Sequence, residues 1–508
     1  MDQSNVSRRV FLGGVATAGI AALGTGAAAA LADEAQAGAE PQWTHEADVV
    51  VVGMGGAGDA AAVAALENGA SVVVLEKTEQ GGGSTRICGG LVYLGGGTEL
   101  QKSLGVEDTP EDMKAYVTAA AGPTADPELL DIYCENSVGL YDWLVDHNVA
   151  FSGGLDEGHV VTAPQGISLT YSGNERSGQY TPVAKAAPRG HTPDGGGAAI
   201  CDALTAIIEG NDNATVLYNT PATELVTDAD GAVIGVKATD ADGNEVAVKA
   251  NRGVVLSAGA FTYNDAMLAD YAGAALALGG KTGVEADTGD GIQMGMRVGA
   301  ATKSMSLLND SQFLYLYGDL PKGVMVNWAG QRFASEDWYG AWVGRYVQQT
   351  TPDTCYVIVD DPTWQSVKET VYGQFLQPAA QADTIEDLAA QVGLPVDATV
   401  ETIDEYNDDC EDGVDLWGKS ADYLTGVRTA PFYAIYWGAK MGSYHTLGGL
   451  KINGSAEVVD LDNEPIPGLY AAGRTSCGIF GQYPGSGSSV ADCLTFGRIA
   501  GESAAKRA

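Results

Sequence analysis

Three glycines with a fixed spacing stand near the start of the chain, directly after a run of valines. Gly53, Gly55 and Gly58 form the pattern G-x-G-x-x-G behind the segment Asp48–Val52. Glycine at these positions permits a tight turn, lets the backbone approach a pyrophosphate, and allows a following helix to pack closely against the strand. The first turn of that helix directs unpaired N–H groups at the phosphates. The spacing therefore predicts a dinucleotide-binding site.

Two strands must position this turn. Val49–Val52 is a run of four valines, which favours a strand buried on both faces, as in a parallel sheet. Ser71–Leu75 has the same character, and Glu76 follows it, where a carboxylate can accept hydrogen bonds from the ribose hydroxyls of an adenosine. A glycine pattern alone recurs by chance, but the flanking strands and the terminal acid favour a strand–turn–helix–strand unit.

Glycine is also dense in the segment that follows, from Gly81 to Gly97. Such density directly after a strand–helix–strand start indicates backbone that lies against a flat or charged ligand. Ser84 and Thr85 stand within this segment, where their hydroxyls can donate hydrogen bonds to the same ligand.

The length and charge of the chain limit its function. A chain of 508 residues, with 45% hydrophobic and 18% charged residues, is long enough for two or three globular domains with substantial cores. The formal net charge of −39 argues against nucleic acid and anionic membrane surfaces as partners. We interpret this charge as a solvated acidic surface.

The first forty residues resemble an export signal rather than part of a fold. Ser7–Leu12 contains the Arg8-Arg9 pair of a twin-arginine signal, and a short apolar run rich in glycine and alanine follows. A retained membrane anchor is the alternative, which the shortness of the run disfavours. We expect export of the folded protein to the periplasm or the outer side of the cytoplasmic membrane, with no further membrane span.

Neither cysteines nor histidines form a metal-binding pattern. The seven cysteines include no C-x-x-C pair, which excludes the usual iron–sulfur run and covalent c-type haem within this chain. An odd, scattered count also argues against a disulfide framework. The histidines are dispersed, and no metal site is predicted. The two sets are Cys88, Cys134, Cys201, Cys355, Cys410, Cys477 and Cys493, and His45, His147, His159, His191 and His445.

Sequence character divides the chain into regions. Residues 45–305 begin with the dinucleotide motif and contain helical stretches at 110–149 and 199–209, then hairpins with turns at Asp228–Gly231 and Asp240–Gly243. Residues 151–197 read as a long irregular segment, which inside a compact domain is usually functional or mobile. Residues 306–431 contain more aromatic and charged residues and helices at 384–392 and 399–408. We predict that they form an inserted second domain, after which 432–508 returns to the first.

Taken together, the motifs resemble those of the flavoprotein family of fumarate reductase, succinate dehydrogenase and the 3-ketosteroid dehydrogenases, over everything after the signal. The resemblance implies FAD, a Rossmann-type α/β FAD-binding domain, and an inserted α+β capping domain that closes over the flavin. It is carried by Val51–Gly58, Gly82–Gly90, Val255–Phe261, Thr288–Gly291, Gly330–Phe333 with Glu336, His445–Gly449 and Gly468–Gly473.

The resemblance also implies which residues contact FAD. We expect the FAD to be bound non-covalently, because no histidine lies in the glycine-rich loops between Gly53 and Gly97. At the start of the last helix, we expect N–H groups to donate to the flavin O2 atom. The expected contacts are Gly53, Gly55, Gly56, Ala57, Gly58, Glu76, Lys77, Gly82, Ser84, Thr85, Gly89, Gly90, Ala222, Ala258, Gly259, Asp290, Gly473, Arg474, Ser489 and Val490.

The arginines that fumarate reductases use to hold a dicarboxylate are missing. Fixed cationic charge offsets the desolvation of such a dianion. The family's acid arginine lies four residues after the glutamate of R-F-x-x-E, where this chain has Gly340. A second arginine belongs in the glycine turn before the last helix, where this chain has Gly481–Gly487. Where fumarate reductases carry a paired histidine before the Thr-x-Gly-Gly sequence, this chain has Tyr444-His445.

Tyr483-Pro484-Gly485-Ser486-Gly487 instead resembles the Tyr-Pro-Gly-x-Gly turn of the 3-ketosteroid dehydrogenases. There the tyrosine hydroxyl and the last glycine N–H polarise the C3 carbonyl, which implies these roles for Tyr483 and Gly487. Tyr339 stands close to the family's second catalytic tyrosine, and His445 is a further candidate. The sequence around Arg189 and His191 resembles the Δ4-(5α) branch of the family. These two residues are candidates for the entrance of the substrate site, with a surface loop as the alternative.

The chemistry of these residue types agrees with the resemblance. Two donors on a ketone oxygen stabilise enolate character and acidify the neighbouring carbon. A tyrosine with a pKa of about 10 acts readily as an acid and needs help to act as a base. This asymmetry favours reduction of a conjugated C=C bond, with Tyr339 or Tyr483 as the proton donor. The structural alternatives are an aromatic wall for Tyr339, a turn glycine for Gly487 and a buried structural histidine for His445.

The sequence therefore predicts an exported FAD oxidoreductase that acts on a C=C bond next to a carbonyl in a largely uncharged, steroid-like or other enone substrate. A separate electron-transfer protein is expected as partner, because the chain contains no cluster or haem motif. A fumarate- or acrylate-type reductase is one alternative, and a flavin electron carrier without substrate turnover is another. The substrate itself and the direction of the reaction stay open.

Overall fold

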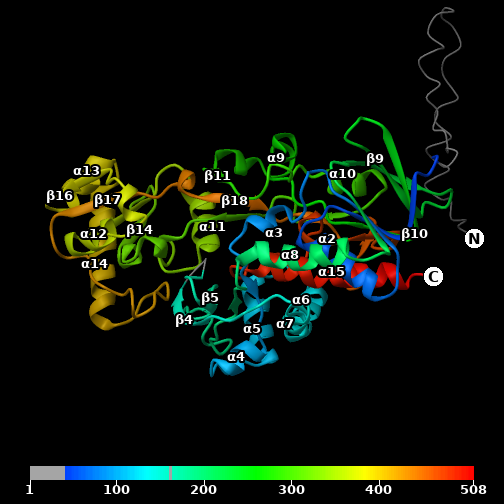
Figure 1. Ribbon diagram of the computed structural model, residues 1–508. Helices are drawn as coiled ribbons and strands as arrows, with labels where there is room; N and C mark the ends of the chain where they lie inside the picture. Colours follow the sequence, from blue (N-terminus) through cyan, green and yellow to red (C-terminus); the bar gives the residue numbers. More distant parts are fainter. Residues whose placement is uncertain (1–40, 160–162) are drawn as a thin grey trace, which may run out of the picture. The chain divides into compact units, whose positions relative to one another are not determined.

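The computed structural model describes residues 41–159 and 163–508, and Trp43–Ala508 forms one compact unit (Figure 1). The predicted export signal, residues 1–40, lies outside the described residues. The described chain is a mixed α/β protein whose largest sheet has eight strands. The predicted α/β class is confirmed.

The centre of the largest sheet is parallel. β1 pairs in parallel with β2 and β10, β2 with β7, and β10 with β21. The valines Val49–Val52 are 0–3% exposed, as a strand covered on both faces requires. The strand order is β20-β21-β10-β1-β2-β7, with bounds β20 (Glu457–Val459), β21 (Pro465–Ala471), β10 (Glu245–Leu256), β1 (His45–Val52), β2 (Val72–Leu75) and β7 (Ala214–Leu217).

The predicted hairpins extend this sheet. β8 (Ala222–Thr227) pairs antiparallel with β9 (Val233–Thr239), which pairs antiparallel with β10. Gly231 and Gly243 have φ of +86° and +85°, so each supplies the left-handed residue of its turn. Both turns lie where the Asp-x-Asp-Gly sequences predict them.

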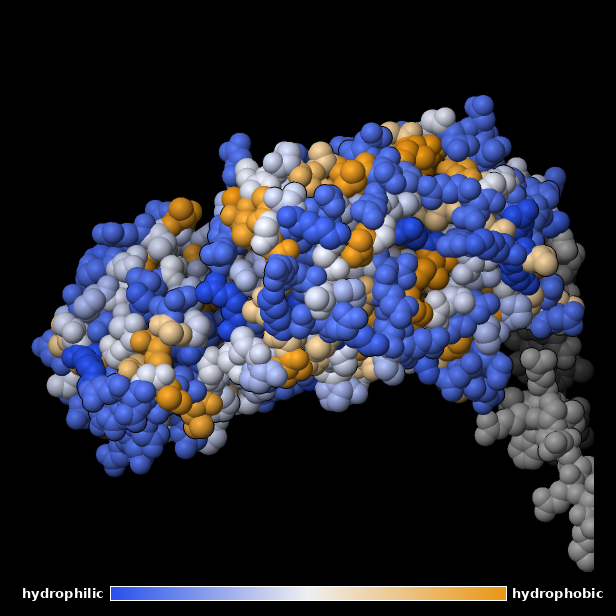
Figure 2. Space-filling model, turned by 90° about the horizontal axis from the view of Figure 1, so that it is seen from below, coloured by the Kyte–Doolittle hydropathy of each residue, from blue (hydrophilic) through white to orange (hydrophobic). Residues whose placement is uncertain are grey.

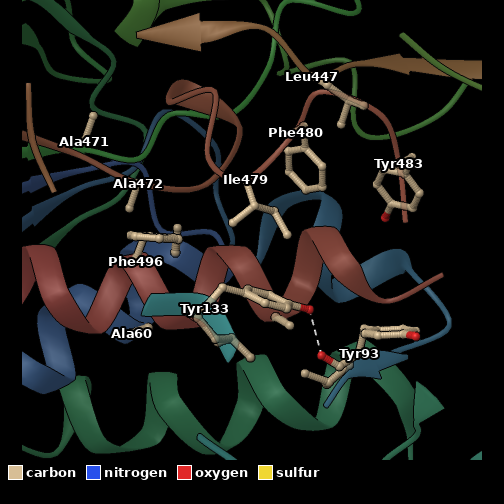
Figure 3. Packing of buried hydrophobic residues seen from close by; sticks show 14 of the residues in the cluster. Ala60, Tyr93, Tyr133, Leu447, Ala471, Ala472, Ile479, Phe480, Tyr483 and Phe496 are labelled. Atoms are coloured by element: carbon tan, nitrogen blue, oxygen red, sulfur yellow. Dashed lines mark hydrogen bonds between the residues drawn. The ribbon is translucent and has the colours of Figure 1, made fainter. Parts of the chain in front are cut away.

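Three helices pack around the central sheet (Figure 1). α2 (Gly56–Glu67) and α8 (Gly196–Glu209) lie against each other, and α15 (Ser488–Lys506) packs along α2. Small residues allow this close contact, because a Cβ atom added at Gly497 would lie 2.4 Å from the Ala57 carbonyl oxygen. Figure 3 shows Phe496 on α15 and Ala60 beside this helix, with Ile479 and Phe480 on one side of it and Tyr133 on the other.

Five helices lie between Gly83 and residue 149, and side chains cap the starts of some of them. Thr109 and Asp126 accept backbone N–H bonds at the starts of α5 and α6, each followed by proline in the first turn. The helical stretch predicted from Pro127 is interrupted at Asn136. The helices are α3 (Gly83–Ile87), α4 (Glu99–Ser103), α5 (Pro110–Ala121), α6 (Pro127–Glu135) and α7 (Ser137–Asp146).

The segment 151–197 is more regular than predicted. It contributes β4 (Gly154–His159), β5 (Ile167–Tyr171) and β6 (Gly190–His191) to a four-stranded sheet completed by β3 (Val92–Tyr93). The prediction of an irregular loop was wrong here. The strands are short and pair with residues distant in sequence, so local hydrophobic alternation does not reveal them.

Residues 306–436 contain a second sheet with its own hydrophobic cluster, which gathers at the left of Figure 1. β17 begins at Phe432 and pairs with β15 and β16, so this sheet continues past residue 431; the predicted domain bounds stay a prediction. Its elements are β14 (Val324–Val326), β15 (Tyr356–Val359), β16 (Ala380–Ala382), β17 (Phe432–Tyr436), α11 (Gly340–Thr350), α12 (Asp361–Lys368), α13 (Ile385–Val392) and α14 (Val396–Asp412).

A ribbon of two antiparallel strands connects this region with the larger sheet. β13 (Leu308–Ser311) pairs with β18 (Ser443–Thr446), and β11 (Gly280–Lys281) adds to the far edge of β18. Alternate residues of the ribbon face opposite sides. The remaining elements are α9 (Asp265–Tyr271), α10 (Asp290–Arg297), β12 (Thr302–Lys303) and β19 (Gly449–Leu450), together with short 3₁₀ turns.

The surface agrees with the acidic composition. Figure 2 shows a face on which hydrophilic residues predominate and apolar residues stand in separate groups. Of the described helices, none is both long enough and apolar enough to cross a membrane.

Candidate functional site

A pocket of about 310 Å³ opens at the carboxyl ends of the parallel strands. The turns after β1, β2, β10 and β21 all contribute to it, which is the usual position of a ligand in an open α/β sheet. Its lining includes most of the predicted FAD contacts: Gly53, Gly55, Gly56, Ala57, Glu76, Lys77, Ser84, Thr85, Ala222, Ala258, Gly259, Asp290, Gly473 and Arg474.

Two predicted glycines line neither pocket and instead shape the walls. A Cβ atom at Gly58 would lie 1.9 Å from the Gly53 carbonyl oxygen, so glycine lets α2 approach the end of β1. Gly82 has a φ of +105° and precedes α3, and its N–H donates to the Met54 carbonyl at 2.5 Å. Gly58 and Gly82 therefore position the loops after β1 and before α3, although neither residue lines the pocket.

Glu76 fixes the turn as well as lining the pocket. Its Oε2 atom accepts the Met54 N–H at 2.8 Å, and its Oε1 atom accepts the Thr78 N–H and hydroxyl at 2.8 and 2.7 Å. Each carboxylate oxygen offers about two lone-pair sites, so Oε2 retains capacity for one more donor. The residue that the sequence predicts for a ribose hydroxyl thus also ties β1 to β2.

Four charged side chains at this pocket form two ion pairs. Lys77 Nζ lies 2.9 Å from Asp290 Oδ2 and donates to Thr288 Oγ1 at 2.8 Å. Arg474 Nη2 lies 2.9 Å from Asp287 Oδ2, and the Ser84 hydroxyl donates to the same oxygen at 2.8 Å. Asp287 was not predicted from the sequence, since it stands outside the glycine motifs.

A second cavity, of about 590 Å³, adjoins the first. Ser84, Thr85 and Arg474 line both, so the two adjoin along a shared wall. The predicted residues Gly89, Gly90, Ser489 and Val490 lie here, with all four catalytic candidates, Tyr339, Tyr483, Gly487 and His445. Lining residues that the sequence analysis missed include Thr282, Asn309, Ser311, Phe313, Ser443 and Ser486.

The two tyrosines stack in this cavity. The rings of Tyr339 and Tyr483 lie 6.2 Å apart at an interplanar angle of 17°. The ring of Phe480 also stacks with Tyr483, at 5.5 Å and 12° (Figure 3). The Tyr339 hydroxyl lies 3.0 Å from Ser486 Oγ. The Tyr483 hydroxyl oxygen accepts the Ser489 N–H at 3.2 Å, which leaves its own proton free to donate.

Both tyrosines stay protonated near neutral pH. Burial raises the pKa of Tyr339 well above 10, with a further contribution from Tyr483. Burial also raises the pKa of Tyr483, although the bond from Ser489 opposes the shift. Both phenols therefore act as hydrogen-bond donors and acids rather than bases.

Gly487 ends the glycine turn and begins α15. Its φ is +94°, and a Cβ atom there would lie 2.8 Å from the Tyr93 amide nitrogen, so only glycine fits. Its carbonyl accepts the N–H groups of Tyr93 and Ala491. This geometry leaves the residue at the N-terminus of a helix of 19 residues, beside the Tyr483 hydroxyl.

His445 lies in the cavity as a neutral side chain. Its Nδ1 atom lies 3.3 Å from the Thr282 hydroxyl, its Nε2 atom is buried without a hydrogen-bond partner, and its ring stands edge-on to Tyr483. Burial and the nearby Arg474 lower its pKa to about 3. It pairs across the β13–β18 ribbon with Asn309, while Tyr444 pairs with Asp310 on the opposite side.

The cavity holds two cationic side chains among its described lining, and both are paired. Arg474 contacts Asp287, and Lys281 Nζ lies 2.6 Å from Asp265 Oδ1. The position of the fumarate reductase acid arginine is also sterically closed. A Cβ atom at Gly340 would lie 2.2 Å from the Phe313 ring. The lining therefore suits an uncharged ligand.

Three basic residues that the motifs singled out lie away from both pockets. Arg189 and His191 are 0% exposed, so neither the substrate-mouth nor the surface-loop prediction is correct. Arg189 pairs with Asp108 at 2.7 Å, and His191 bonds Thr98 at 2.8 Å. Arg332 pairs with Glu336 at 2.8 Å inside a buried ion cluster. Asp108 and Thr98 lie more than eighty residues away in the sequence, so the sequence analysis did not show that they pair with Arg189 and His191. Glu336 belongs to the same motif as Arg332.

No group of three or more metal-ligating side chains occurs among residues 41–159 and 163–508. The cysteines are all free in this part of the chain, and Cys88 and Cys493 line the cavity.

Comparison with known proteins places these features in context. A family model described as an FAD binding domain matches residues 48–490. Urocanate reductase of Eggerthella lenta is 31% identical over 490 residues, which cover 91% of this chain and 75% of the relative. The crystal structure of 3-ketosteroid-Δ4-(5α)-dehydrogenase from Rhodococcus jostii, in complex with 4-androstene-3,17-dione, is 36% identical with a TM-score of 0.87, covering 92% of this chain and 98% of that one.

A third similarity is to the open conformation of a flavocytochrome c3 fumarate reductase. It is 27% identical with a TM-score of 0.64, covering 92% of this chain and 79% of that one. The similarity to fumarate reductases and ketosteroid dehydrogenases that the motifs predict is confirmed.

Proposed function

The chain belongs to the family of flavoproteins that share this FAD-binding domain, and we propose that it reduces a C=C bond conjugated to a carbonyl in an uncharged substrate. It is an FAD-dependent oxidoreductase of the group that acts on CH–CH bonds. The substrate class rests on one observation: within the described lining of the substrate cavity, each cationic side chain is already paired with a carboxylate.

FAD is the cofactor, and the residues present fit it. The start of α2 and Gly53–Ala57 line the phosphate side, Glu76 Oε2 keeps a free lone pair toward the ribose, and the dense glycines leave room for a flat ring. When bound, FAD supplies hydride transfer to or from a carbon atom. We propose non-covalent binding, because no histidine stands in the glycine-rich loops at 53–97.

The turn before α15 supplies the donors for the carbonyl oxygen. The Tyr483 hydroxyl accepts from Ser489 and has its proton free, and the Gly487 N–H stands at the N-terminus of α15. Two donors on one oxygen stabilise the enolate character that develops when hydride reaches the β-carbon. Burial of the turn strengthens these hydrogen bonds, and the two cations of the lining, Lys281 and Arg474, are each paired with a carboxylate.

Tyr339 supplies the proton for the α-carbon. Its hydroxyl lies 3.0 Å from Ser486 Oγ, and both groups line the cavity. A phenol with a raised pKa holds its proton at neutral pH and releases it to a developing carbanion, which favours the reductive direction. Ser486 orients the hydroxyl and offers a second oxygen through which the proton can pass.

We also propose where the protein acts and how it receives electrons. The twin-arginine pattern at Arg8-Arg9 supports export of the folded, FAD-loaded protein to the periplasm or the outer side of the cytoplasmic membrane. A separate electron-transfer protein then delivers electrons, because this chain carries no cluster or haem motif.

The test is anaerobic. The FAD-loaded protein is reduced with dithionite, and its flavin absorbance is followed during addition of a Δ4-3-ketosteroid in one experiment and fumarate in another. Rapid reoxidation by the ketosteroid but not by fumarate is the expected result. Reoxidation by fumarate alone would overturn the assignment in favour of a dicarboxylate reductase, and no reoxidation by any of a panel of enones would favour an electron carrier.

A further inference from the structure

The segment Ser172–Glu175 packs directly against the glycine turn that holds Tyr483. The Ser486 N–H donates to the Ser172 carbonyl at 2.7 Å, and the Ser172 hydroxyl donates to the Ser486 carbonyl at 3.0 Å. A Cβ atom at Gly485 would lie 3.0 Å from the Cα atom of Gly173. The two backbones therefore touch. A Cβ atom at Gly173 would lie 2.8 Å from the Pro484 carbonyl oxygen, so glycine at position 173 permits this close approach.

Buried side chains hold this segment from behind. The Tyr116 hydroxyl accepts the Asn174 N–H at 2.7 Å and donates to the Pro484 carbonyl at 2.8 Å. The Glu175 carboxylate accepts the Gly173 N–H and the Tyr93 hydroxyl, each at 2.9 Å. The segment is thus fixed to the glycine turn through both backbone and side chains.

The same segment also holds Tyr339. The Asn174 side-chain oxygen accepts the Tyr339 N–H at 2.6 Å, and Asn174 is 3% exposed. Tyr339 immediately precedes α11, in the region that carries the second sheet, whereas its hydroxyl reaches Ser486 in the glycine turn. Tyr339 is therefore held at two points, its backbone by Asn174 and its hydroxyl by Ser486.

We propose that Asn174 is a positioning residue that sets the distance between the Tyr339 hydroxyl and the glycine turn. This inference rests on the proposed function, because it assigns Asn174 to the proton-donating tyrosine of that site. The argument is geometric: Ser172 binds the Ser486 backbone, Asn174 binds the Tyr339 backbone, and the two residues belong to one short, buried segment. Small displacements of a proton donor lower turnover steeply.

The first experiment measures the anchoring itself, with no substrate. Hydrogen exchange by mass spectrometry follows the peptide spanning residues 338–343 in the FAD-loaded wild type, Asn174→Ala and Asn407→Ala. Asn407 is a matched control, since it is 7% exposed and its Oδ1 accepts the Val427 N–H at 2.7 Å, away from both pockets. We expect exchange in this peptide to rise about 3- to 10-fold in Asn174→Ala only. Equal exchange in all three proteins would overturn the proposal.

The second experiment measures the effect on turnover in a double-mutant cycle. Enone-driven reoxidation is compared in wild type, Asn174→Ala, Tyr339→Phe and the double variant. We expect Asn174→Ala to lower the maximal rate about 10- to 100-fold with little change in KM, and to add little in the Tyr339→Phe background. An equal loss in both backgrounds would show a general structural role and contradict the proposal.

A variant of similar size separates the lost hydrogen bond from lost packing. Asn174 Nδ2 has no hydrogen-bond partner, so Asn174→Asp keeps the acceptor oxygen, although it adds a buried carboxyl beside Glu175. Recovery of slow exchange in Asn174→Asp supports the acceptor role, and slow exchange that is already retained in Asn174→Ala contradicts it. If the wild type reduces no enone, the proposed function fails, while the exchange experiment still decides whether Asn174 anchors Tyr339.

Discussion

The cofactor pocket and the substrate cavity share a boundary at Ser84, Thr85 and Arg474 but are built in different ways. The cofactor pocket forms at the ends of adjacent parallel strands, largely from short motifs. The substrate cavity is assembled from β13, the start of α11, β18 and the turn before α15, which lie far apart in the sequence. A dinucleotide can therefore be recognised by local backbone geometry, whereas the substrate is recognised by the packing of distant segments.

The two spaces also differ in the side chains that line them. Lys77 and Asp290 form a partly exposed ion pair at the edge of the cofactor pocket. The substrate cavity presents tyrosines, serines, Asn309 and a neutral His445. We therefore expect substitutions in the substrate cavity to alter turnover without loss of FAD, and substitutions in the cofactor pocket to alter FAD binding.

The largest effect is expected from Tyr483→Phe. Loss of one carbonyl donor should lower the rate of enone-driven reoxidation about 10²- to 10³-fold, as for other oxyanion donors, while the FAD content stays unchanged. Stopped-flow absorbance and the flavin-to-protein ratio measure the two quantities. Tyr356→Phe, on the distant β15, is the control. A Tyr483→Phe protein that loses FAD together with activity would contradict the idea that Tyr483 serves the substrate cavity alone.

A smaller effect is expected from Gly340→Arg, which restores the fumarate reductase residue. Its Cβ atom would meet the Phe313 ring, so we expect a loss of about 1–3 kcal/mol in the free energy of unfolding and no gain of fumarate reduction. Denaturant unfolding and anaerobic fumarate assays provide the readouts. Combination with Phe313→Ala should recover part of the stability. Fumarate turnover in either variant would contradict the idea that the cavity geometry excludes the clamp.

The neutral histidine predicts a pH dependence of stability. The unfolded chain binds a proton at His445 below about pH 6.5, but the folded protein does so only near its pKa of about 3. Stability from this residue therefore falls as the pH is lowered from about 6.5 toward 3, by up to about 1.4 kcal/mol per pH unit. His445→Gln should lose this part of the slope in urea unfolding at pH 4–7. Identical slopes would mean that His445 is protonated in the folded state.

The smallest effect is expected at the edge of the cofactor pocket. Lys77 and Asp290 are 27% and 37% exposed, so their ion pair contributes about 0.2–1 kcal/mol. Lys77→Met should weaken FAD binding less than about 5-fold, more clearly at low salt than at high salt. Fluorescence titration of the apoprotein tests this, with Lys114→Met as a control, because Lys114 pairs with Asp131 outside the pocket. A loss of all binding would contradict a peripheral role.

The sequence predicted the parts of the molecule that local patterns determine. The Val49–Val52 strand, the glycine turn, the hairpins with Asp-x-Asp-Gly turns and the last helix lie where they were expected. Each depends on residues within one or two turns of chain, so periodicity and glycine positions suffice.

The parts that the sequence did not reveal depend on partners far away in the chain. β5 and β6 are short and pair across about twenty residues, and Arg189 is buried because it meets Asp108. Asn309 and Ser311 stand in a polar stretch for which the sequence analysis predicted no strand. Pairing with β18 makes it a strand, and both residues line the cavity. Such contacts leave no local pattern in the hydrophobic spacing.

One side of the β13–β18 ribbon lines the substrate cavity, and the other side packs against the protein interior. Asn309 and His445 face the cavity, whereas Asp310, opposite Tyr444, packs against Gly344 of α11 and Gly442. Mutations on the cavity side can thus alter which molecules are accepted while the packing beneath remains intact. In a lineage that meets many related compounds, this ribbon offers a short evolutionary route to new substrates, requiring few substitutions and no rebuilding of the scaffold.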